Sequence, residues 1–198
     1  MARKYELKAR AERQEETRRR IVEAAIDLHR TVGPAQTSFS AIAERAGVQR
    51  HTLYRHFPDE RAMGLACSGL YSERNPLPDP SPWREIGDPG ERLRAGLGAL
   101  YDYYEGNRHM LGCVVRDAAI DPLVRELSEL RFGPGMAEIG QALGEVLPHP
   151  RSKATRAALA LALDFTTWQL LVERGGLGSA QAADQMARAT LCAARQPD

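Results

Sequence analysis

The chain has 198 residues, 43% of them hydrophobic, which is enough to bury one large or two small cores. Its formal net charge is only +1, but residues 1–74 carry 14 basic and 10 acidic residues (+4) and the remainder carries 13 and 16 (−3). No stretch approaches the roughly 20 apolar residues that a bilayer requires, and no signal-peptide core is present, so we expect a cytoplasmic protein. Cys67, Cys113 and Cys192 lie far apart without a C-x-x-C pair, which favours buried, reduced thiols over a redox or metal site.

The first 20 residues form a basic arm in which eight Lys and Arg residues stand against four Glu residues. Such an arm can enter a minor groove or lie along phosphates, as in some helix-turn-helix proteins. The alternative is a solvated, partly helical tail whose acids and bases pair at i,i+4. The sequence leaves both interpretations open.

Three helices follow the arm, and a tight turn joins the second to the third. Apolar residues recur at helical spacing over residues 21–32, and Gly33-Pro34 ends that run. Ser38 is a natural N-cap for a second helix, and Gly47 ends this helix because glycine readily adopts the left-handed conformation. A third helix begins at Gln49. This order of helix, tight turn and helix is that of a helix-turn-helix.

The third helix presents Leu53 and Phe57 to the core and leaves donors, flat rings and positive charge outside. In a helix-turn-helix, the second helix of the motif enters the major groove. Arg50 is the best candidate for reading a base, because arginine can bind guanine O6 and N7 together, and Gln49 suits adenine. The other candidates for DNA contacts, several of them suited to phosphates, are Ser38, His51, Thr52, Tyr54, Arg55 and His56.

The residues of this block occur in an order that is typical of one family. They resemble the N-terminal block of the tetracycline-repressor (TetR) family of transcriptional regulators at Thr37-Ser38, Ile42-Ala43, Ala46-Gly47-Val48, Thr52-Leu53-Tyr54 and His56-Phe57. The resemblance covers about the first third of the chain. It implies an all-α protein with three DNA-binding helices and a larger helical domain for ligand sensing and dimerisation, usually acting as a repressor. It also implies DNA contacts by Ser40, Arg50, His51, Thr52, Tyr54 and His56.

One position departs from the family. A lysine that touches phosphate usually follows the recognition helix, and here Glu60 stands at that position, with Arg61 after it. Either Arg61 takes over this contact or the contact is lost. Glu60 is therefore not a candidate site.

We expect a basic arm at residues 1–20, a DNA-binding domain at 21–58, and a ligand-binding and dimerisation domain at 59–198. In the last part, Asp59 can cap a fourth helix up to about Arg74, which would connect the two functions. Residues 75–90 include five prolines, so we expect an ordered loop there. Trp83 in this loop either packs in the core or closes a ligand cavity.

Helical periodicity resumes after Pro89 and continues to the C-terminus, with no strand pattern. We expect separate helical segments around residues 93–104 and 110–115, and a further helix that starts at Asp121-Pro122. The run Phe132-Gly133-Pro134-Gly135 should break or sharply bend that helix. Two more helices are expected, at Thr155 to Glu173 and at Ala180 to Ala194.

The last two helices predict a homodimer. Residues 155–173 are apolar nearly all round, and residues 180–194 carry small residues that permit close helix approach. A two-fold four-helix interface built from both helices of each subunit would bury these surfaces. Dimerisation would also place two recognition helices about one duplex turn apart on a palindromic operator.

The resemblance further implies a small-molecule effector that binds in the C-terminal domain and shifts the fourth helix. The effector should be mainly apolar, because few charges fall on the inward stripes. Candidate pocket residues are the aromatic, soft or isolated polar groups on those stripes: Cys67, Tyr71, Trp83, Tyr101, Tyr104, Met110, Val114, Asp117, Phe165, Trp168 and Gln169.

We expect no enzyme activity, cofactor or metal, because no Glu-x-x-His pair or P-loop is present. The nearest catalytic constellation is His109 with Cys113, which lacks an orienting third group. A remaining alternative is an architectural or ligand-independent DNA-binding protein.

Overall fold

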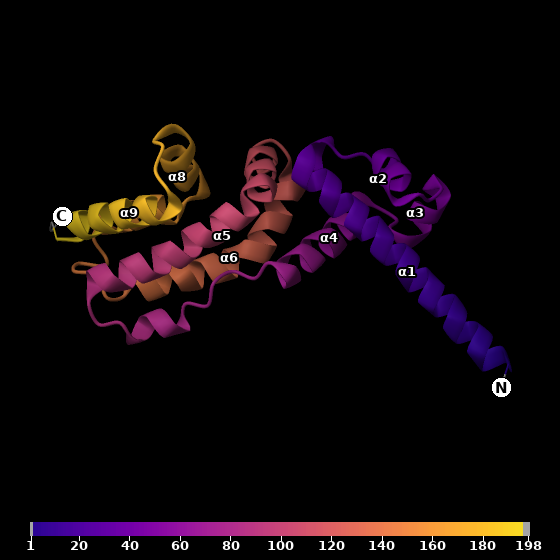
Figure 1. Cartoon of the computed structure of the whole chain (residues 1–198), viewed down its shortest axis with the longest axis horizontal. Coiled ribbons are helices and arrows are strands. Elements are labelled where there is room, and N and C mark those ends of the chain that lie inside the picture. Colours follow the sequence, from indigo (N-terminus) through magenta and orange to yellow (C-terminus); the bar gives the residue numbers. More distant parts are fainter. Residues whose placement is uncertain (1, 196–198) are drawn as a thin grey trace. The chain divides into compact units, whose positions relative to one another are not determined.

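The structure is a computed structural model that describes the backbone of residues 2–195 and the side chains of residues 8–195. This part of the chain is all helical and contains no strand, as the sequence predicts (Figure 1). The helices are α1 (Ala2–Thr31), α2 (Phe39–Ala46), α3 (Arg50–His56), α4 (Glu60–Arg74), α5 (Pro89–Ala118), α6 (Pro122–Gly144), α7 (Lys153–Leu163), α8 (Phe165–Gln169) and α9 (Ser179–Ala194). Short turns of helix, η1 (Pro34–Gln36), η2 (Ser81–Glu85) and η3 (Leu170–Arg174), lie between them.

The chain forms two compact units. The first combines Met1–Asn75 with His109–Arg131, and the second combines Pro76–Arg108 with Phe132–Asp198. Helices α5 and α6 each contribute residues to both units. These units describe packing, whereas the boundary expected at residue 58 concerns function and stays a prediction.

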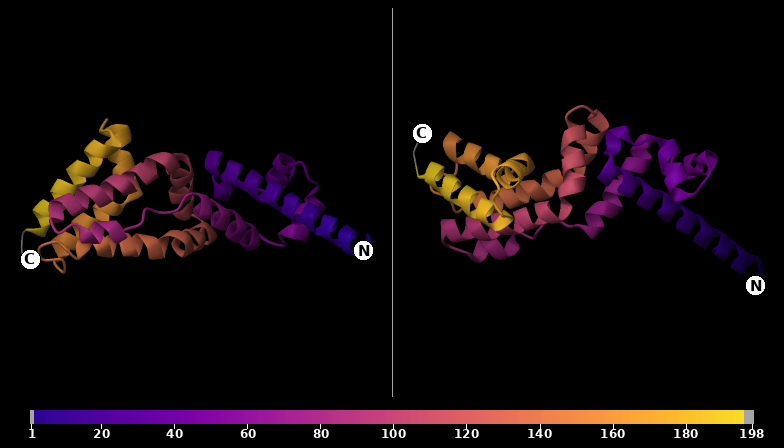
Figure 2. Two further views of the ribbon diagram at one scale, coloured as in Figure 1. Left: turned by 60° about the horizontal axis from the view of Figure 1, so that its bottom comes forward. Right: turned by 45° about the horizontal axis from the view of Figure 1, so that its top comes forward.

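Helix α1 corrects one expectation about the N-terminus. The helix begins at Ala2, so the basic arm is part of the same continuous helix that was expected to start at Ile21. In Figures 1 and 2 its N-terminal half extends beyond α2 and α3. Ion pairs one turn apart support the extension, with Lys8 Nζ 3.8 Å from Glu12 and Arg19 Nη2 2.9 Å from Glu16. The side chains of Arg3, Lys4 and Glu6 lie outside the described residues.

Helices α5 and α6 are longer than the sequence suggested. The two segments expected at 93–104 and 110–115 form one helix, which continues through the polar residues between them. The side-chain amide of Asn107, within this polar stretch, donates to the Tyr103 carbonyl at 2.8 Å. Helix α6 starts at Pro122 as predicted and passes through Pro134 without the expected break. Pro134 is exposed, so water can satisfy the carbonyl that has lost its helical partner.

The helix expected at residues 155–173 is instead two helices, because Asp164 ends one and caps the next. Helix α7 ends at Leu163, and the Asp164 carboxylate accepts a hydrogen bond from the Thr167 N–H at 2.9 Å to start α8. The carbonyls at the end of α7 accept hydrogen bonds from tyrosine hydroxyls, at 3.0 Å from Tyr101 to Ala162 and at 2.6 Å from Tyr104 to Leu163. Side chains of α5 therefore stabilise the break.

The proline-rich loop is held to the second unit by Trp83 and Arg92. Trp83 is 7% exposed and packs on Gly96 of α5. Arg92 is buried and donates to the carbonyls of Ile86 at 2.7 Å and of Arg84 at 2.8 Å. Hydrogen bonds from one buried guanidinium to two loop carbonyls fix the course of the loop, as expected of an ordered segment. None of the helices in the described range combines the length and apolar composition needed to cross a bilayer.

Candidate nucleic-acid interface

Helices α2 and α3 form a helix-turn-helix with the capping residues that the sequence predicts. The Ser38 hydroxyl accepts a hydrogen bond from the Ala41 N–H at 3.2 Å and so caps α2. Gly47 ends α2 in the left-handed conformation (φ 64°, ψ 39°), and the Val48 N–H closes the turn on the Ala43 carbonyl at 2.9 Å. Helix α3 begins at Arg50, one residue later than expected, and Gln49 is its N-cap.

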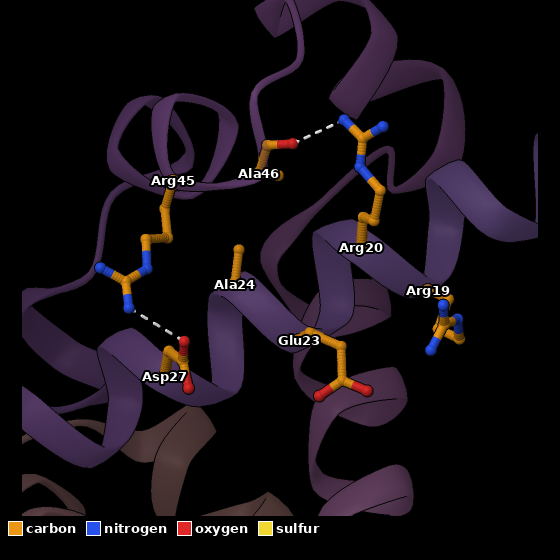
Figure 3. Close-up of a pocket in the computed structure, with 7 residues that line it drawn as sticks. All are labelled: Arg19, Arg20, Glu23, Ala24, Asp27, Arg45 and Ala46. Atoms are coloured by element: carbon orange, nitrogen blue, oxygen red, sulfur yellow. Dashed lines mark hydrogen bonds and ion pairs between the residues drawn. The ribbon is translucent and has the colours of Figure 1, made fainter.

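Helix α1 fixes the turn between α2 and α3 (Figure 3). Arg20 of α1 donates hydrogen bonds to the carbonyls of Ala46, at 2.7 Å, and of Gly47, at 3.3 Å. A cation at these carbonyls complements the negative end of the α2 dipole. Arg45 reaches back to Asp27 of α1 at 3.0 Å, across a shallow groove of about 270 Å³ between the two helices.

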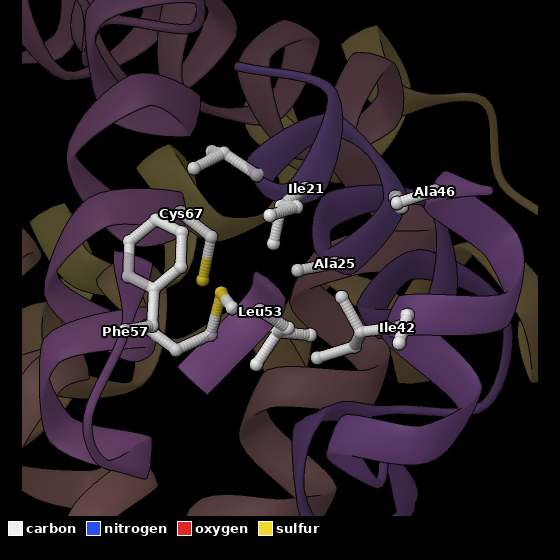
Figure 4. Close-up of a cluster of buried hydrophobic side chains, with 11 residues drawn as sticks. Ile21, Ala25, Ile42, Ala46, Leu53, Phe57 and Cys67 are labelled. Carbon is white, nitrogen blue, oxygen red and sulfur yellow. The ribbon is translucent and has the colours of Figure 1, made fainter. Parts of the chain in front are cut away.

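An apolar core sets the orientation of α3 (Figure 4). Leu53 and Phe57 are fully buried, as predicted, and pack with Ile21 of α1, Ile42 of α2 and Cys67 of α4. Each of these side chains removes apolar surface from water, worth about 1.5–3 kcal/mol for a large aliphatic or aromatic group. The opposite face of α3 is thereby turned outward.

Four of the expected DNA contacts line one shallow groove. Ser38 and Ser40 of α2 and Arg50 and Tyr54 of α3 share a groove of about 570 Å³ with Phe39 and with the first residues of α4. The rings of Phe39 and Tyr54 lie 5.2 Å apart, which helps to orient the tyrosine hydroxyl. No DNA contact is predicted for Phe39 from the sequence, although this aromatic residue directly follows the cap of α2.

The other expected contacts are spread over the outer face of α3. Gln49, His51 and Arg55 are exposed. Thr52 is half-buried, and its hydroxyl lies 3.3 Å from His51 Nε2. His56 is also half-buried, and its Nε2 atom is shielded without a hydrogen-bond partner among the described residues. A contact of that nitrogen with a phosphate therefore requires the ring to turn.

Burial and two neighbouring arginines lower the pKa of His56. The main cause is desolvation, followed by the charges of Arg55 and Arg18. The Arg18 guanidinium lies 4.3 Å from the centre of the Phe57 ring and donates to the His56 carbonyl at 3.3 Å. Arg18 thus anchors the C-terminal end of α3 on α1.

Arg61 has an ion-pair partner in the structure. The side chain lines the groove at Arg50 and Tyr54, and its Nη2 atom lies 2.7 Å from Glu126 at the start of α6. Both side chains of the pair are about half exposed, so the pair is open to competition from another anion. Glu60 stands at the position that often touches phosphate in the family, and Arg61, the cation next to it, is already paired with a carboxylate.

The end of α5 is tied to the loop that precedes α2. The buried Asp117 accepts hydrogen bonds from the Ala35 N–H, at 3.0 Å, and from Arg116 Nε, at 2.7 Å. Arg116 in turn donates to the Val32 carbonyl at 2.7 Å. Gly33, with φ +100°, leaves room for both side chains to approach the backbone. Asp117 was a candidate for ligand binding, and here it shapes the turn after α1.

The eleven candidate effector residues divide between the two units. Cys67, Tyr71, Met110, Val114 and Asp117 belong to the first unit, and Trp83, Tyr101, Tyr104, Phe165, Trp168 and Gln169 belong to the second. Four of the latter form a cluster in which Tyr104 contacts Phe165 and Trp168, with ring centres 5.4 and 5.9 Å apart. The Trp168 indole donates to the Ser179 hydroxyl at 3.1 Å. We call Tyr101, Tyr104, Phe165 and Trp168 the aromatic cluster.

The cysteine thiols have environments of three kinds. Cys67 is buried, which raises the pKa of its thiol to about 11, and its Sγ lies 3.6 Å from His29 Nδ1. Cys113 is half-buried and donates to the Arg30 carbonyl at 3.7 Å. Cys192 is exposed, contrary to the expectation of buried thiols. A neutral thiol such as that of Cys67 is a poor nucleophile.

Comparison with known proteins agrees with this geometry. Residues 21–67 match the family model of bacterial regulatory proteins, tetR family. NalD, the secondary repressor of the MexAB-OprM multidrug efflux pump in Pseudomonas aeruginosa, is 25% identical, with a TM-score of 0.62 over 92% of this chain and 97% of NalD. A mutant of HlyIIR is 18% identical, with a TM-score of 0.64 over 89% and 97%. The multidrug binding protein EbrR, complexed with imidazole, is 24% identical, with a TM-score of 0.51 over 88% and 89%. No curated protein sequence matches the chain.

A capped helix-turn-helix with an outward-facing second helix, at the head of an all-helical chain, defines a DNA-binding regulator of transcription. Residues 21–67 therefore form a DNA-binding domain of the TetR family of transcriptional regulators, and the chain shares the fold of solved regulators such as NalD.

Proposed function

We propose that this protein is a homodimeric repressor that binds a palindromic operator through α3 and is released by a small, mainly apolar molecule. The observation that carries the proposal is the groove at the start of α2 and α3, where the exposed residues Ser38, Ser40, Arg50 and Tyr54 share one lining with Arg61 and with the carboxylates of Asp59 and Glu60. Hydroxyl groups and helix N-termini are typical phosphate donors, and an arginine near the start of a recognition helix is a typical base reader. A cytoplasmic location follows from this function.

Arg50 is the proposed base reader in this arrangement. It is the first residue of α3 and is exposed, which is the position from which side chains reach base edges. Gln49 and His51 flank it, and we assign phosphate contacts to Ser38, Ser40 and Tyr54, which line the same groove as Arg50. Thr52, Arg55 and His56 complete the proposed contact surface.

The proposed dimer uses the outer faces of α7 and α9. Within one chain these two helices pack on each other and bury Ala183, Ala187 and Thr190 of α9. These small residues are therefore not available for contact with a second subunit. Other small or apolar side chains remain exposed: Ala157, Ala160 and Leu161 on α7, and Ala189 and Cys192 on α9. Leu161 is 58% exposed, and small residues beside it would let a second α7–α9 pair approach closely.

The proposed effector binds at the aromatic cluster. Its rings pack on one another as a buried apolar cluster, and its tyrosine hydroxyls are already bonded to backbone carbonyls at the break between α7 and α8. A ligand that inserts between these rings would compete with those bonds and move α5. NalD is the secondary repressor of a multidrug efflux pump and EbrR is named a multidrug binding protein, which supports a small-molecule effector here.

Release from DNA would follow from the continuity of α5 and α6. Asp117 at the end of α5 holds the loop before α2, while Leu127 and Arg131 of α6 pack against Gly64 and Gly69 of α4. Arg131 also donates to the Leu65 carbonyl at 2.9 Å. A shift of either long helix therefore acts on the elements that orient α3. In the proposed dimer, a small change in the distance between the two α3 helices is enough to weaken operator binding.

The test is a selection of preferred duplexes from a random pool at near-physiological salt, followed by a small-molecule screen for release. A palindrome with half-sites about one turn apart is expected. Arg50→Ala should lose about 1–3 kcal/mol at one base position, whereas Tyr54→Phe should weaken all sequences alike. Recovery of no preferred duplex would instead favour an architectural DNA-binding protein.

A further inference from the structure

We infer that the N-terminal half of α1 is a second DNA-binding surface, a basic helix face that lies on the phosphate backbone beside the half-site. The inference rests on the proposed DNA-binding function and extends its footprint. We call this surface the basic face and define it by Arg10, Arg13, Thr17 and Arg20.

Helical spacing gathers these four residues on one side of α1. They are separated by three, four and three positions, so at about 100° per residue they fall within a sector of about 80°. Among residues 8–20, the acids Glu12, Glu15 and Glu16 project from another side of the helix. Charge is therefore separated around the helix axis, although the segment as a whole is mixed.

The acidic side is largely neutralised within the helix. Glu12 lies 3.8 Å from Lys8, and Glu16 accepts two hydrogen bonds from Arg19 Nη2 at 2.9 Å. On the basic face, Arg13 Nε donates to the Ala9 carbonyl at 3.3 Å. Among residues 8–195, no carboxylate forms an ion pair with Arg10 or Arg13. The guanidinium groups of Arg10 and Arg13 therefore remain for an anionic partner, whereas the Thr17 hydroxyl donates to the Arg13 carbonyl at 2.8 Å and Arg20 donates to backbone carbonyls.

The basic face begins where the recognition helix begins. Arg20, at its C-terminal end, holds the carbonyls of Ala46 and Gly47, which form the turn before α3 (Figure 3). The N-terminal end of α3 is the end that faces bases in a helix-turn-helix. From this turn α1 continues toward its N-terminus and extends beyond α2 and α3 in Figures 1 and 2, and by helical spacing the basic face follows it. It is therefore continuous with the proposed DNA surface.

A continuous helix decides between the two ways in which a basic arm can bind DNA. An α-helix with side chains is about 10–12 Å wide, whereas the minor groove of B-DNA is about 6 Å wide, so the arm cannot enter that groove as an extended arm does. Residues 8–17 span about 15 Å of helix, comparable to about four steps of 3.4 Å along one strand. Arginine and threonine side chains on such a face suit phosphates, which carry no base identity.

The experiment compares two double variants with the same loss of charge. Arg10→Ala with Arg13→Ala removes the basic face, whereas Lys8→Ala with Arg19→Ala removes cations that are paired with acids on the other side. All four changes put alanine in an exposed helix, so neither protein should lose its fold. The affinity for the selected duplex is measured between 50 and 200 mM salt, with about six base pairs of flanking DNA and without them.

We expect the Arg10/Arg13 variant to bind the flanked duplex at least about tenfold more weakly at low salt. The slope of log affinity against log salt should fall by about two, since each phosphate contact contributes about 0.9. The Lys8/Arg19 variant should keep most of the slope, and both should keep the base preference. For the wild type, removal of the flanks should reproduce the loss.

Equal salt slopes for the two double variants would overturn the inference, as would wild-type affinity that does not depend on the flanks. A change in oligomeric state without a change in slope would assign the face to a protein partner and would also overturn it. A different result would contradict the proposed function itself, namely that the wild-type protein selects no preferred duplex.

Discussion

Gly33→Ala is the substitution that most directly tests how the end of α5 is joined to the DNA-binding helices. Gly33 is buried and has φ +100° and ψ 154°, a backbone conformation that residues with a side chain rarely adopt. A Cβ at this position would collide with the side chains of Arg116 and Asp117. The substitution therefore strains the backbone and displaces a buried carboxylate at once.

The two effects can be estimated separately. A residue held in a sparsely populated backbone region costs on the order of 1–3 kcal/mol. Displacement of Asp117 leaves the Ala35 N–H without its acceptor, which costs about 1–3 kcal/mol for a buried group. Together we expect a loss of roughly 2–6 kcal/mol, and a fall in Tm of about 2–4 °C for each kcal/mol in a chain of this size.

Calorimetry and urea unfolding followed by circular dichroism would measure the loss, with two other glycines as controls. Gly176 has φ +68° and open space around its Cα, so Gly176→Ala reports backbone strain alone, about 1 kcal/mol. Gly98 lies in α5 with open space and an ordinary backbone, so Gly98→Ala should be neutral or slightly stabilising. If Gly33→Ala cost no more than Gly176→Ala, the contact with Arg116 and Asp117 would not constrain this turn.

Three further predictions concern pH, DNA affinity and assembly. Burial lowers the pKa of His29 from its usual 6.5 to about 4, so the unfolded chain binds a proton below pH 6.5 that the folded chain refuses. The free energy of unfolding should therefore fall by about 1.4 kcal/mol per unit between pH 6.5 and 4, roughly 3 kcal/mol in all, and His29→Gln should remove this part of the acid sensitivity in urea titrations. Glu126→Gln frees Arg61 for a phosphate and should tighten operator binding a few-fold at low salt, with stability changed by less than about 1 kcal/mol. Leu161→Glu places a charge in the proposed interface and should yield monomers in light scattering and loss of cooperative operator binding.

Each of these predictions has a contradicting result. Full acid sensitivity in His29→Gln would assign the pH dependence to other groups. Glu129→Gln removes the same charge from an exposed position of α6, so equal tightening by Glu129→Gln and Glu126→Gln would show a general charge effect. A Leu161→Glu protein that remains dimeric would place the interface elsewhere on the chain.

Residue type and spacing are enough to predict the local structure of the DNA-binding helices. Ser38, Gly47 and Asp59 act through hydrogen bonds and backbone angles within a few residues, so their roles as caps could be predicted from residue type and spacing. The inward positions of Leu53 and Phe57 followed from helical periodicity for the same reason. The groove residues Ser38, Arg50 and Tyr54 were candidates before their placement was known.

Contacts between residues far apart in the chain explain the features that the sequence did not predict. The break at Asp164 depends on hydroxyls of α5, the role of Asp117 depends on Gly33 and Ala35, and the pairing of Arg61 depends on Glu126. Helix α6 likewise passes through Pro134, where local propensity alone predicts an interruption. Local rules determine how each helix begins and ends, whereas packing between distant helices determines which charged groups are bound and which, such as Arg10 and Arg13, remain available.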